Sequence, residues 1–316
     1  MIPFYSVVIP VYNRAEELGR ALLSVLAQTE QDFEIVVVDD GSEDEPERTV
    51  DAFRDPRIVL LKQPNLGGAA ARNAGIDAAR GHFIAFLDSD DTFLPHHLAA
   101  MRFLLADTEN VAGYARIIVD RGAGRTFLKP PRAIGRTEHM ATYVLCDRGF
   151  VPTTTLVVET QWARRVRYDE RLGFAQDTDF CIRLYLAGCR FVMAKEPGAV
   201  WSDVVDDRRI SAGRKGGRMI EWLEWMRPDI PRQAYYGARG WMIAKGIAPS
   251  APLRALSLYL SAVVRGSYRP RMAAVIVLQI FFPDWLYRRL VDSLVELFRG
   301  AVWSRAERLA RQPAAR

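Results

Sequence analysis

The sequence predicts an α/β protein built around a mostly parallel sheet with helices on its faces. Two observations support this fold class. Three apolar segments typical of buried strands, at residues 6–13, 33–42 and 81–91, each end in polar residues. Short segments with helical spacing of apolar residues lie between them, and strands that alternate with short helices are typical of a parallel sheet. With 316 residues, the chain can form one large domain or two smaller ones.

The first part of the chain supplies most of the expected sheet. The first strand ends at Pro10, and Asn13 with Glu16 resembles a capping box at the start of a helix that extends to about Gln28. Apolar residues of that helix recur at helical spacing, so one of its faces is expected to pack on the sheet. The further elements expected here are a strand at residues 34–38, a helix at 47–53, a strand at 57–62, a helix at 69–79 and a strand at 82–87.

The pattern becomes less regular after residue 91. Residues 121–137 are rich in Gly, Pro and Arg, and we expect them to form a long functional or mobile loop. The other expected elements are a helix at residues 96–106, a strand at 111–119, a strand-like segment at 152–158, and helices at 178–187, 253–264, 271–282 and 284–302. The last helix is expected to be amphipathic, because its apolar residues recur every four positions: Leu286, Leu290, Leu294, Phe298 and Val302.

Charge divides the chain into two unequal parts. Residues 1–207 carry 23 Lys or Arg against 31 Asp or Glu, whereas residues 208–316 carry 20 against 7, so the net charges are about −8 and +13. The second part also contains five of the seven tryptophans. This asymmetry indicates an acidic body joined to a basic helical segment that binds an anionic surface. The alternative is a helical subdomain packed on the body.

Several features indicate a protein of a reducing compartment that contacts a membrane only from one side. Cys146, Cys181 and Cys189 have no ligand-like spacing with histidine, and we expect them to be free thiols. The first five residues lead directly into a strand, which leaves no room for a signal peptide. The longest apolar run, residues 272–282, is much shorter than the roughly twenty residues of a membrane-spanning helix. We therefore expect no membrane span.

The most informative stretch is Asp88-Ser89-Asp90-Asp91, which follows the third apolar segment. Three carboxylates in four positions are too costly to bury unpaired, and no basic residue lies near them in the sequence. Asp88 and Asp90 share one side of an extended backbone. Hard oxygen ligands of this kind suit Mg²⁺ or Mn²⁺, which would hold a diphosphate. The alternative is a strand followed by a solvated turn, in which Asp and Ser are common.

The two earlier strands, at residues 6–13 and 33–42, favour a metal-binding site at residues 88–91 over a solvated turn. Because the carboxyl ends of parallel strands meet at one edge of a sheet, the polar residues after all three strands are expected together, where open α/β sheets bind ligands. A dinucleotide-dependent oxidoreductase is disfavoured, because residues 11–15 replace the glycine-rich turn expected after the first strand.

Five motifs together resemble the inverting family 2 glycosyltransferases, whose nucleotide-sugar-binding fold is called GT-A. The motifs occur in the family's order: Pro10-Val11-Tyr12-Asn13; Val38-Asp39-Asp40-Gly41-Ser42; Asn65-Leu66-Gly67-Gly68 with Ala71-Arg72-Asn73-Ala74-Gly75; Leu87-Asp88-Ser89-Asp90-Asp91; and Gln176-Asp177-Thr178-Asp179-Phe180. The resemblance implies a catalytic domain at residues 1–212, with a donor-nucleotide half at 1–91 and an acceptor half at 92–212. A helical, basic, membrane-associating region at 213–316 would follow.

The resemblance also implies how the donor is bound. Tyr12 would stack on uracil, and Asp40 would accept a hydrogen bond from the base. Asp90 would be the principal ligand of a divalent Mn or Mg ion, and Asp88 would contact the ribose, or the metal through water. The implied donor-binding residues are Pro10, Tyr12, Asp40, Gly67, Gly68, Arg72, Asn73, Asp88, Ser89 and Asp90, with Asp90 and Asp88 as the metal ligands.

Gly67 and Gly68 suit a phosphate site for a physical reason. Glycine lets a ligand approach the backbone closely, and the amide groups and dipole of a helix start favour phosphate. Arg72 and Asn73 follow on the first turns of the same helix and could reach the same phosphates.

Asp177 matches the family's catalytic base and is expected immediately before a helix. Inversion requires the acceptor oxygen to attack opposite the leaving group, so one carboxylate suffices and no covalent intermediate forms. Asp179 fits a carboxylate at the helix start better than a base. Gln176 departs from the family pattern, which often has Glu there, so the resemblance says less about the acceptor.

A second departure lies at residues 200–211, where many relatives have a metal-binding histidine and this chain has none. Asp203 or Asp206 could replace it, or Arg208 and Arg209 could hold the diphosphate directly, and the sequence leaves these alternatives open. The four histidines lack metal-ligand spacing and are expected to be structural: His82, His96, His97 and His139.

The resemblance therefore implies a metal-dependent inverting hexosyltransferase that uses a nucleotide sugar, expected to be a UDP-sugar. The acceptor would be a polyprenyl-diphosphate-linked oligosaccharide at the cytoplasmic face of the inner membrane, in bacterial exopolysaccharide or cell-surface glycan synthesis. The expected partners are the donor, the lipid-linked acceptor and an anionic membrane surface, without nucleic acid. The alternative is a catalytically silent, membrane-bound scaffold of a polysaccharide assembly complex, against which the retained Asp90 and Asp177 argue.

Overall fold

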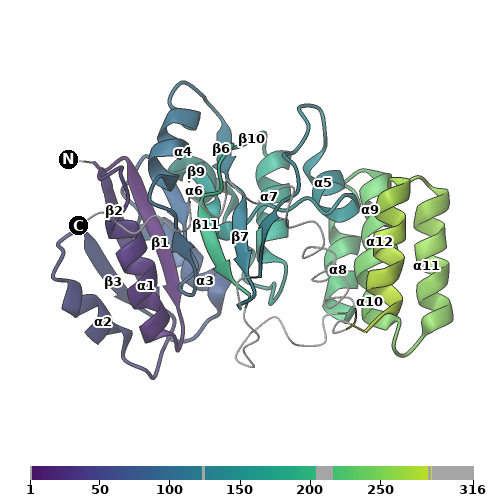
Figure 1. Ribbon diagram of the computed structural model, residues 1–316, viewed down its shortest axis with the longest axis horizontal. Helices are drawn as coiled ribbons and strands as arrows, with labels where there is room; N and C mark the ends of the chain where they lie inside the picture. Colours follow the sequence, from purple (N-terminus) through teal and green to yellow (C-terminus); the bar gives the residue numbers. More distant parts are fainter. Residues whose placement is uncertain (1, 123–124, 204–215, 284–285, 287–316) are drawn as a thin grey trace.

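The computed structural model describes residues 2–122, 125–203, 216–283 and 286. Its centre is a seven-stranded sheet in the order β10-β6-β9-β4-β1-β2-β3 (Figure 1). The strands are β1 (Tyr5–Val11), β2 (Phe33–Asp39), β3 (Ile58–Lys62), β4 (Phe83–Phe86), β6 (Val111–Tyr114), β9 (Val157–Glu159) and β10 (Arg190–Met193). Neighbouring strands are parallel except that β9 is antiparallel to β4 and β6. The predicted α/β class with a mostly parallel sheet is therefore confirmed.

The strands at the centre of this sheet are buried on both faces. Every residue of β2 is buried, as are all residues of β1 except Pro10, which is typical of strands covered by helices on each side. α1 (Ala15–Leu26) packs on one face through its predicted apolar side, whose buried residues are Leu18, Ala21, Leu22 and Val25. α3 (Gly68–Ala78) packs on the opposite face. α2 (Pro46–Phe53) lies beside α1.

The predicted capping box at the start of α1 is wrong. The helix begins after Arg14 and has no side-chain cap. Asn13 instead adopts a φ of +50°, and its Oδ1 accepts a hydrogen bond from the amide of Glu43 at 2.8 Å. The amide of Asn13 donates to Ser42 Oγ at 3.0 Å. The loop after β2 therefore uses the side chain that would have capped the helix, and these contacts fasten the ends of β1 and β2 together.

A second, four-stranded sheet follows the order β5-β11-β7-β8. It contains β5 (Thr92–Phe93), β7 (Ile117–Asp120), β8 (Thr126–Lys129) and β11 (Ala199–Ser202). The strand predicted at residues 111–119 is therefore wrong, because β6 and β7 belong to different sheets. Thr155 gives the physical reason: its Oγ1 accepts from the amide of Ala115 at 3.1 Å and donates to the carbonyl of Ala115 at 2.9 Å, so the backbone there pairs with a side chain instead of a strand.

Two further expectations are corrected in this part of the chain. The loop predicted at residues 121–137 contains β8, which pairs with β7. The strand-like segment predicted at 152–158 begins with a 3₁₀ turn, Thr153–Thr155, and β9 starts only at Val157. The helices of this region are α4 (His97–Leu105), α5 (Met140–Cys146), α6 (Thr160–Val166) and α7 (Gln176–Leu186). The three cysteines are free and buried, as predicted.

The carboxyl-terminal part of the described chain is a layer of helices at the end of the molecule farthest from β3 (Figure 1). It contains α8 (Gly216–Met226), α9 (Arg232–Ala238), α10 (Ala244–Ile247), α11 (Pro252–Val264) and α12 (Pro270–Phe281). The helices predicted at residues 253–264 and 271–282 are confirmed as α11 and α12. The predicted helix at 284–302 lies outside the described residues, apart from Leu286. Within the described ranges, no helix is both long and apolar enough to cross a bilayer.

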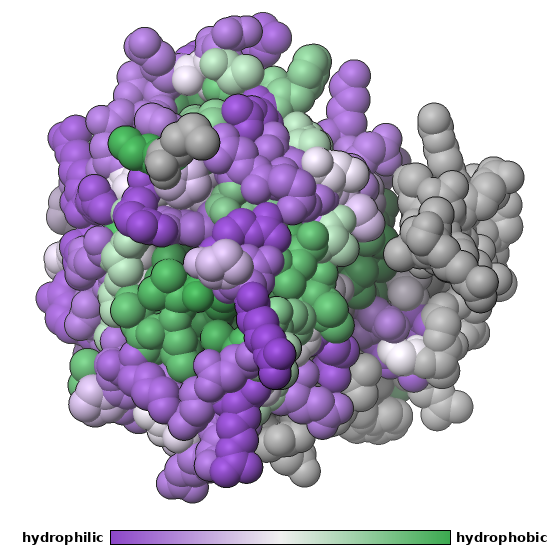
Figure 2. All heavy atoms as spheres, turned by 90° about the vertical axis from the view of Figure 1, so that its left-hand side faces the viewer, coloured by the Kyte–Doolittle hydropathy of each residue, from purple (hydrophilic) through white to green (hydrophobic). Residues whose placement is uncertain are grey.

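The opposite end of the molecule carries one of the two edge strands of the main sheet, β3. β3 has a strand neighbour on one side only, and its Val59 is 39% exposed. From this end the surface is mostly hydrophilic, with hydrophobic areas near its centre and smaller ones elsewhere (Figure 2). β3 is short and ends at Lys62, and both features limit pairing with another strand edge.

Candidate active site

The carboxyl ends of three parallel strands meet at one edge of the main sheet. β1 lies between β2 and β4, with Val11 level with Asp39 and Val8 level with Phe86. The residues that follow these strands, including Tyr12, therefore lie at the same edge. This arrangement follows the general rule for ligand sites in open α/β sheets, on which the sequence analysis relied.

The aspartates after β4 are paired with arginines. Arg72 Nη2 lies 2.6 Å from Asp88 Oδ1, and Arg14 Nη1 forms an ion pair with Asp90 Oδ2. The expectation that these carboxylates have no basic neighbours is therefore wrong. The arginines come from the start of α1 and from the second turn of α3, so only the fold brings them to Asp88 and Asp90.

Negative charge is nevertheless concentrated here. Burial raises the pKa of Asp90, and the charge of Asp88 raises it further, whereas Arg14 opposes the shift. Burial also raises the pKa of Asp91 well above its ordinary range, and both neighbouring aspartates add to the shift. Thr154 Oγ1 donates a hydrogen bond to Asp91. A cation near these groups would favour their ionised forms.

Arg72 also contacts the beginning of α7. Its Nη1 donates to Gln176 Oε1 at 3.0 Å and to the carbonyl of Gly68 at 3.3 Å, and its guanidinium lies 5.5 Å from the ring centre of Tyr168. Arg72 thus joins Asp88 to Gln176. Gln176, noted in the sequence only as a departure from the family pattern, is a neutral hydrogen-bond partner of this arginine.

Asp177 lies in the first turn of α7, and not before the helix as predicted. Its Oδ1 accepts a hydrogen bond from the amide of Thr178 at 2.7 Å, and its Oδ2 accepts none from the described residues. Burial raises the pKa of Asp177, and the charge of Asp88 adds to this effect, whereas Thr178 and Arg72 oppose it. Asp177 therefore shares the electrostatic environment of Asp88 and Arg72.

Asp179 has different surroundings. It is fully buried, its Oδ2 accepts from Arg183 Nε at 2.7 Å, and its Oδ1 accepts from Trp222 Nε1 at 2.9 Å. Both oxygens are thus engaged by the protein. The structure gives Asp179 a role in holding α8 against α7.

Tyr12 and Asp40, the predicted base-binding residues after β1 and β2, differ in exposure. Tyr12 is 38% exposed. Asp40 is buried, and its carboxylate accepts three hydrogen bonds from the loop before α3, namely from Gln63 Nε2 at 2.7 Å, the Leu66 amide at 2.9 Å and the Gly67 amide at 2.8 Å. Asp40 therefore fixes the loop that leads to the predicted phosphate site.

Gly67 and Gly68 stand at the start of α3, as the sequence predicts. Gly67 has a φ of +93°, and a Cβ added to it would meet nothing within 4 Å. The backbone conformation therefore requires glycine there, and open space lies beside it. A Cβ on Gly68 would come within 3.1 Å of Arg72 Nη1.

The structure does not bring Asn73 to the phosphate site. Its Nδ2 donates to the carbonyl of Tyr168 at 2.9 Å and to Glu170 Oε1 at 2.8 Å. Its Oδ1 accepts from the amide of Tyr168 at 2.9 Å. This buried side chain holds the loop before α7. Ser89, also predicted for the donor site, is buried between the two paired aspartates.

Four residues were proposed to replace the missing histidine, and the structure describes only one of them, Asp203. Asp203 is buried and lies 3.1 Å from Arg121 Nε. Asp206, Arg208 and Arg209 lie outside the described residues. Among the residues that the structure describes, no three His, Cys, Asp or Glu side chains form a group that could hold a metal ion.

The histidines have structural surroundings. His96 Nε2 lies 3.0 Å from the carbonyl of Pro197, and His139 Nδ1 accepts from the amide of Ala141 at the start of α5. His97 is buried, and burial lowers its pKa to about 3, so it is neutral at physiological pH. His82 lines the pocket described next.

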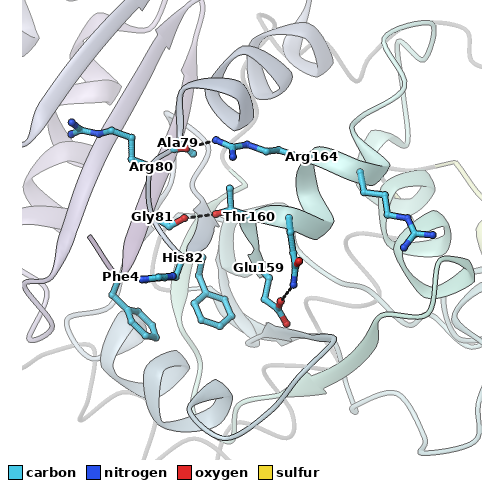
Figure 3. Close-up of a pocket in the computed structure, with 11 residues that line it drawn as sticks. Phe4, Ala79, Arg80, Gly81, His82, Glu159, Thr160 and Arg164 are labelled. Atoms are coloured by element: carbon cyan, nitrogen blue, oxygen red, sulfur yellow. Dashed lines mark hydrogen bonds between the residues drawn. The ribbon is translucent and has the colours of Figure 1, made fainter. Parts of the chain in front are cut away.

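A pocket of about 1100 Å³ lies at the opposite edge of the main sheet, beside the amino end of β4 (Figure 3). Its arginines are engaged by the protein: Arg164 Nη2 donates to the carbonyl of Ala79 at 2.7 Å, and Arg80 pairs with Glu34 at 2.5 Å. Thr160 Oγ1 donates to the carbonyl of Gly81 at 2.5 Å. The candidate active site is therefore the edge with Asp88, not this pocket.

The ion pair of Arg14 with Asp90 was not predicted from the sequence. Arg14 follows directly on the motif that ends at Asn13, and a cation at the start of a helix beside a strand end was the available signal. Thr154 lies in the segment predicted as strand-like at residues 152–158, and its partner Asp91 lies 63 positions away. Neither contact is visible in local sequence.

These observations define a class of protein. A parallel-rich α/β sheet with aspartates and arginines at its carboxyl edge is the GT-A fold of nucleotide-sugar-dependent transferases, and the structural neighbours have the same fold. The chain belongs to glycosyl transferase family 2, whose model matches residues 6–173.

Particular relatives extend this result. The chain is 30% identical over 246 residues to the amylovoran biosynthesis glycosyltransferase AmsB of Erwinia amylovora, a match that covers 73% of this chain and 80% of AmsB. Its fold is similar to that of S. aureus TarS in complex with UDP-GlcNAc, with a TM-score of 0.61, 17% identity, and coverage of 95% and 93%. The mannosyltransferase PcManGT of Pyrobaculum calidifontis, in complex with GDP-Man and Mn²⁺, gives a TM-score of 0.57, 18% identity, and coverage of 95% and 88%.

Proposed function

We propose that this protein is a metal-dependent inverting glycosyltransferase that moves a hexosyl group from a UDP-sugar to a lipid-linked oligosaccharide. The observation that carries the proposal is the network in which Arg72 contacts both Asp88 and Gln176, next to Asp177. It combines a cation for the diphosphate with a carboxylate of raised pKa. These are the two groups that sugar transfer to a hydroxyl requires.

The relatives support the donor and the pathway. The TarS structure is a complex with UDP-GlcNAc, and the PcManGT structure is a complex with GDP-Man and Mn²⁺. AmsB is named for amylovoran biosynthesis, which favours a role in bacterial exopolysaccharide or cell-surface glycan synthesis. The acceptor we propose is an oligosaccharide carried on a polyprenyl diphosphate.

The donor set at the edge of the sheet fits a divalent cation. Asp88 and Asp90 supply hard oxygen ligands. Burial and the charge of Asp88 raise the pKa of Asp90, and a bound cation would oppose this shift. A magnesium-type ion needs only one or two carboxylates when substrate phosphates and water complete its coordination. When bound, the ion would stabilise the charge of the departing diphosphate.

The chain's own residues would perform the rest of the reaction. The amide group of Gly68 and the guanidinium of Arg72 would face the phosphates. Asp177 Oδ2 takes the proton of the acceptor hydroxyl while the acceptor oxygen forms a bond to C1 of the sugar. The bond between C1 and the diphosphate oxygen breaks on the opposite side, so the configuration inverts without a covalent intermediate. The raised pKa of Asp177 makes it a stronger base than an ordinary aspartate.

We further propose that the protein acts as a peripheral protein at the cytoplasmic face of the inner membrane. The basic excess of residues 208–316 supports this location. The catalytic domain would comprise residues 1–212, and the membrane-associating region residues 213–316. The alternative function, a silent scaffold of a polysaccharide assembly complex, is disfavoured because Asp90 and Asp177 are both present at the site.

A donor screen tests the proposed function. Purified protein with Mn²⁺ or Mg²⁺ is given a panel of nucleotide sugars and a membrane lipid extract, and nucleotide release and glycosylated lipid mass are measured. We expect release of UDP from at least one donor, and loss of release in excess chelator or in the Asp90→Asn variant. Full activity in chelator would contradict metal dependence, whereas Asp51→Asn, on the exposed side of α2, serves as a control that keeps activity.

A further inference from the structure

α11 carries an exposed apolar stripe. Leu253 and Val264, near its two ends, are 82% and 84% exposed, and Leu256 and Leu260 between them are 38% and 49% exposed. Their spacing of three, four and four residues places them on one side of the helix. The opposite side is buried against the helical layer through Ala255, Tyr259 and Ala262. We call these four exposed residues the α11 stripe.

The surroundings of the α11 stripe are basic. Residues 230–283 contain seven Lys or Arg and no Asp or Glu. Arg254 lies on α11 and Arg265 directly follows it, each roughly a third of a turn from the stripe. Arg271 follows at the start of α12. Within the described part of the chain, no carboxylate lies in ion-pair distance of Arg254 or Arg271. Their charge is therefore available to an external anion.

The positive charge around the α11 stripe indicates which kind of partner binds it. A second copy packed stripe to stripe would bring the same arginines together. Residues 287–316 of the chain carry seven Arg and three Asp or Glu, so they too would add positive charge. An anionic lipid surface complements both features, because apolar side chains enter the headgroup boundary while arginines meet lipid phosphates.

The contact between the helical layer and the catalytic body shows on which side of the active site the helical layer, with the α11 stripe, lies. Trp222 of α8 donates to Asp179, two residues after Asp177 on α7. The helical layer thus joins the catalytic body on the side of the proposed base. The strands of the nucleotide half, β1 to β3, lie toward the other end of the molecule (Figure 1).

We propose that α11 docks the protein on an anionic membrane, with Leu253, Leu256, Leu260 and Val264 in the headgroup boundary. Arg254 and Arg271 bind lipid phosphates beside them. This inference takes from the proposed function only that the protein binds a membrane. It assigns the membrane contact to one face of α11. It does not depend on the donor or on catalysis.

The test compares flotation of full-length variants with vesicles of phosphatidylglycerol and phosphatidylcholine. We expect wild-type protein to float with these vesicles at low salt, and Leu260→Glu with Val264→Glu to reduce binding at least about tenfold. The matched control, Leu23→Glu with Phe103→Glu, adds the same charge at two apolar side chains of the catalytic body that are 60% and 90% exposed. We expect the control to bind within about twofold of wild type.

Two further variants separate the apolar contribution from charge. Leu260→Ser with Val264→Ser should also lose binding, although it adds no charge. Arg254→Gln with Arg271→Gln should weaken binding to anionic vesicles and reduce its salt dependence. Thermal unfolding by circular dichroism checks that each variant is folded.

Three results would overturn the proposal. One is flotation of the Leu260→Glu, Val264→Glu variant equal to wild type, which would place the membrane contact elsewhere. The second is no flotation of wild-type protein on anionic vesicles. The third is a wild-type dimer in sedimentation analysis that this variant dissociates, which would make the stripe a contact between copies. UDP-sugar binding in vesicle-free solution is measured in parallel, so that failure of the proposed function is distinguishable from failure of docking.

Discussion

At the residue scale, Arg72 links the two carboxylates on which the proposed reaction depends. It contacts Asp88 directly and reaches the start of α7 through Gln176. A guanidinium can make these contacts at once because its donors are arranged in a rigid plane. Arg72 also opposes the rise in the pKa of Asp177. The charge state of the base is therefore coupled to the group proposed to bind the diphosphate.

The raised pKa of Asp177 predicts how activity depends on pH. A base must be deprotonated, so kcat/KM should fall with acidification through a pKa above the ordinary value of 3.8. A pH profile of transfer measures this. An acidic limb at or below 3.8 would contradict the prediction. Protonation of Asp177 does not itself destabilise the fold, because a raised native pKa contributes stability that is present at low pH and is lost as pH rises through that pKa.

The residue-scale site was only partly predictable from sequence. The motifs identified Asp88, Asp90 and Asp177, because strand ends of known order must share one edge. Their ion pairs were not predictable, because Arg14 and Arg72 approach Asp90 and Asp88 from helices 76 and 16 positions earlier in the chain. Local composition shows charges but not which of them the fold brings together.

At the element scale, α3 determines how closely the phosphate site lies to the sheet. It is rich in small residues, and a Cβ on Gly75 would lie 2.3 Å from Val8 Cγ1 and 3.4 Å from Val38 Cγ2. The distance to Val8 Cγ1 is shorter than any van der Waals contact, so glycine is required for packing. The close approach places the start of α3 beside the ends of β1 and β2.

Gly75→Ala should therefore destabilise the fold although alanine favours helices. Overpacking of this kind costs about 1–3 kcal/mol, which urea unfolding can measure. Gly19→Ala in α1 is the matched control, because its Cβ would lie 3.5 Å from Thr49 Cγ2, an ordinary contact. We expect the control to be neutral or up to about 1 kcal/mol more stable. Equal free energies of unfolding for Gly75→Ala and wild type would contradict the packing argument.

Element boundaries were predictable where a hydrophobic pattern was long and uninterrupted. α11 and α12 follow their predicted ranges within one residue at either end, since Pro252 and Pro270 mark their starts. The single strand predicted at residues 111–119 failed because Thr155 occupies the backbone groups of Ala115. A side chain 40 positions away leaves no trace in local periodicity.

At the scale of the whole molecule, the helical layer shares a hydrophobic core with the catalytic body, and one buried hydrogen bond also joins them. Trp222 is 4% exposed and donates to Asp179, which also pairs with Arg183. A hydrogen bond to a buried charged group is costly to remove, because the carboxylate loses a donor that water cannot replace. This contact places the basic helices next to α7, and thus on the side of Asp177.

Trp222→Phe should reduce the free energy of unfolding by about 1.5–3 kcal/mol. Trp225→Phe, in the same helix, is the control. Trp225 is 49% exposed, and the guanidinium of Arg171 lies 5.5 Å from its ring centre, so loss of this interaction should cost less than about 1 kcal/mol. Thermal or urea unfolding of both variants measures the difference. Equal losses would show that the Asp179 contact does not hold the layer in place.

The central claim is that Asp177 acts as the base, whereas Asp179 is structural. The most direct measurement compares Asp177→Asn and Asp179→Asn for sugar transfer and for UDP-sugar binding, using the donor found in the screen. The account predicts that Asp177→Asn keeps its fold and donor affinity but loses transfer by at least about a hundredfold. The main effect of Asp179→Asn should be a loss of stability, because Asp179 pairs with Arg183 and accepts a hydrogen bond from Trp222. Near-wild-type transfer by Asp177→Asn, or a greater loss of kcat in folded Asp179→Asn, would contradict it.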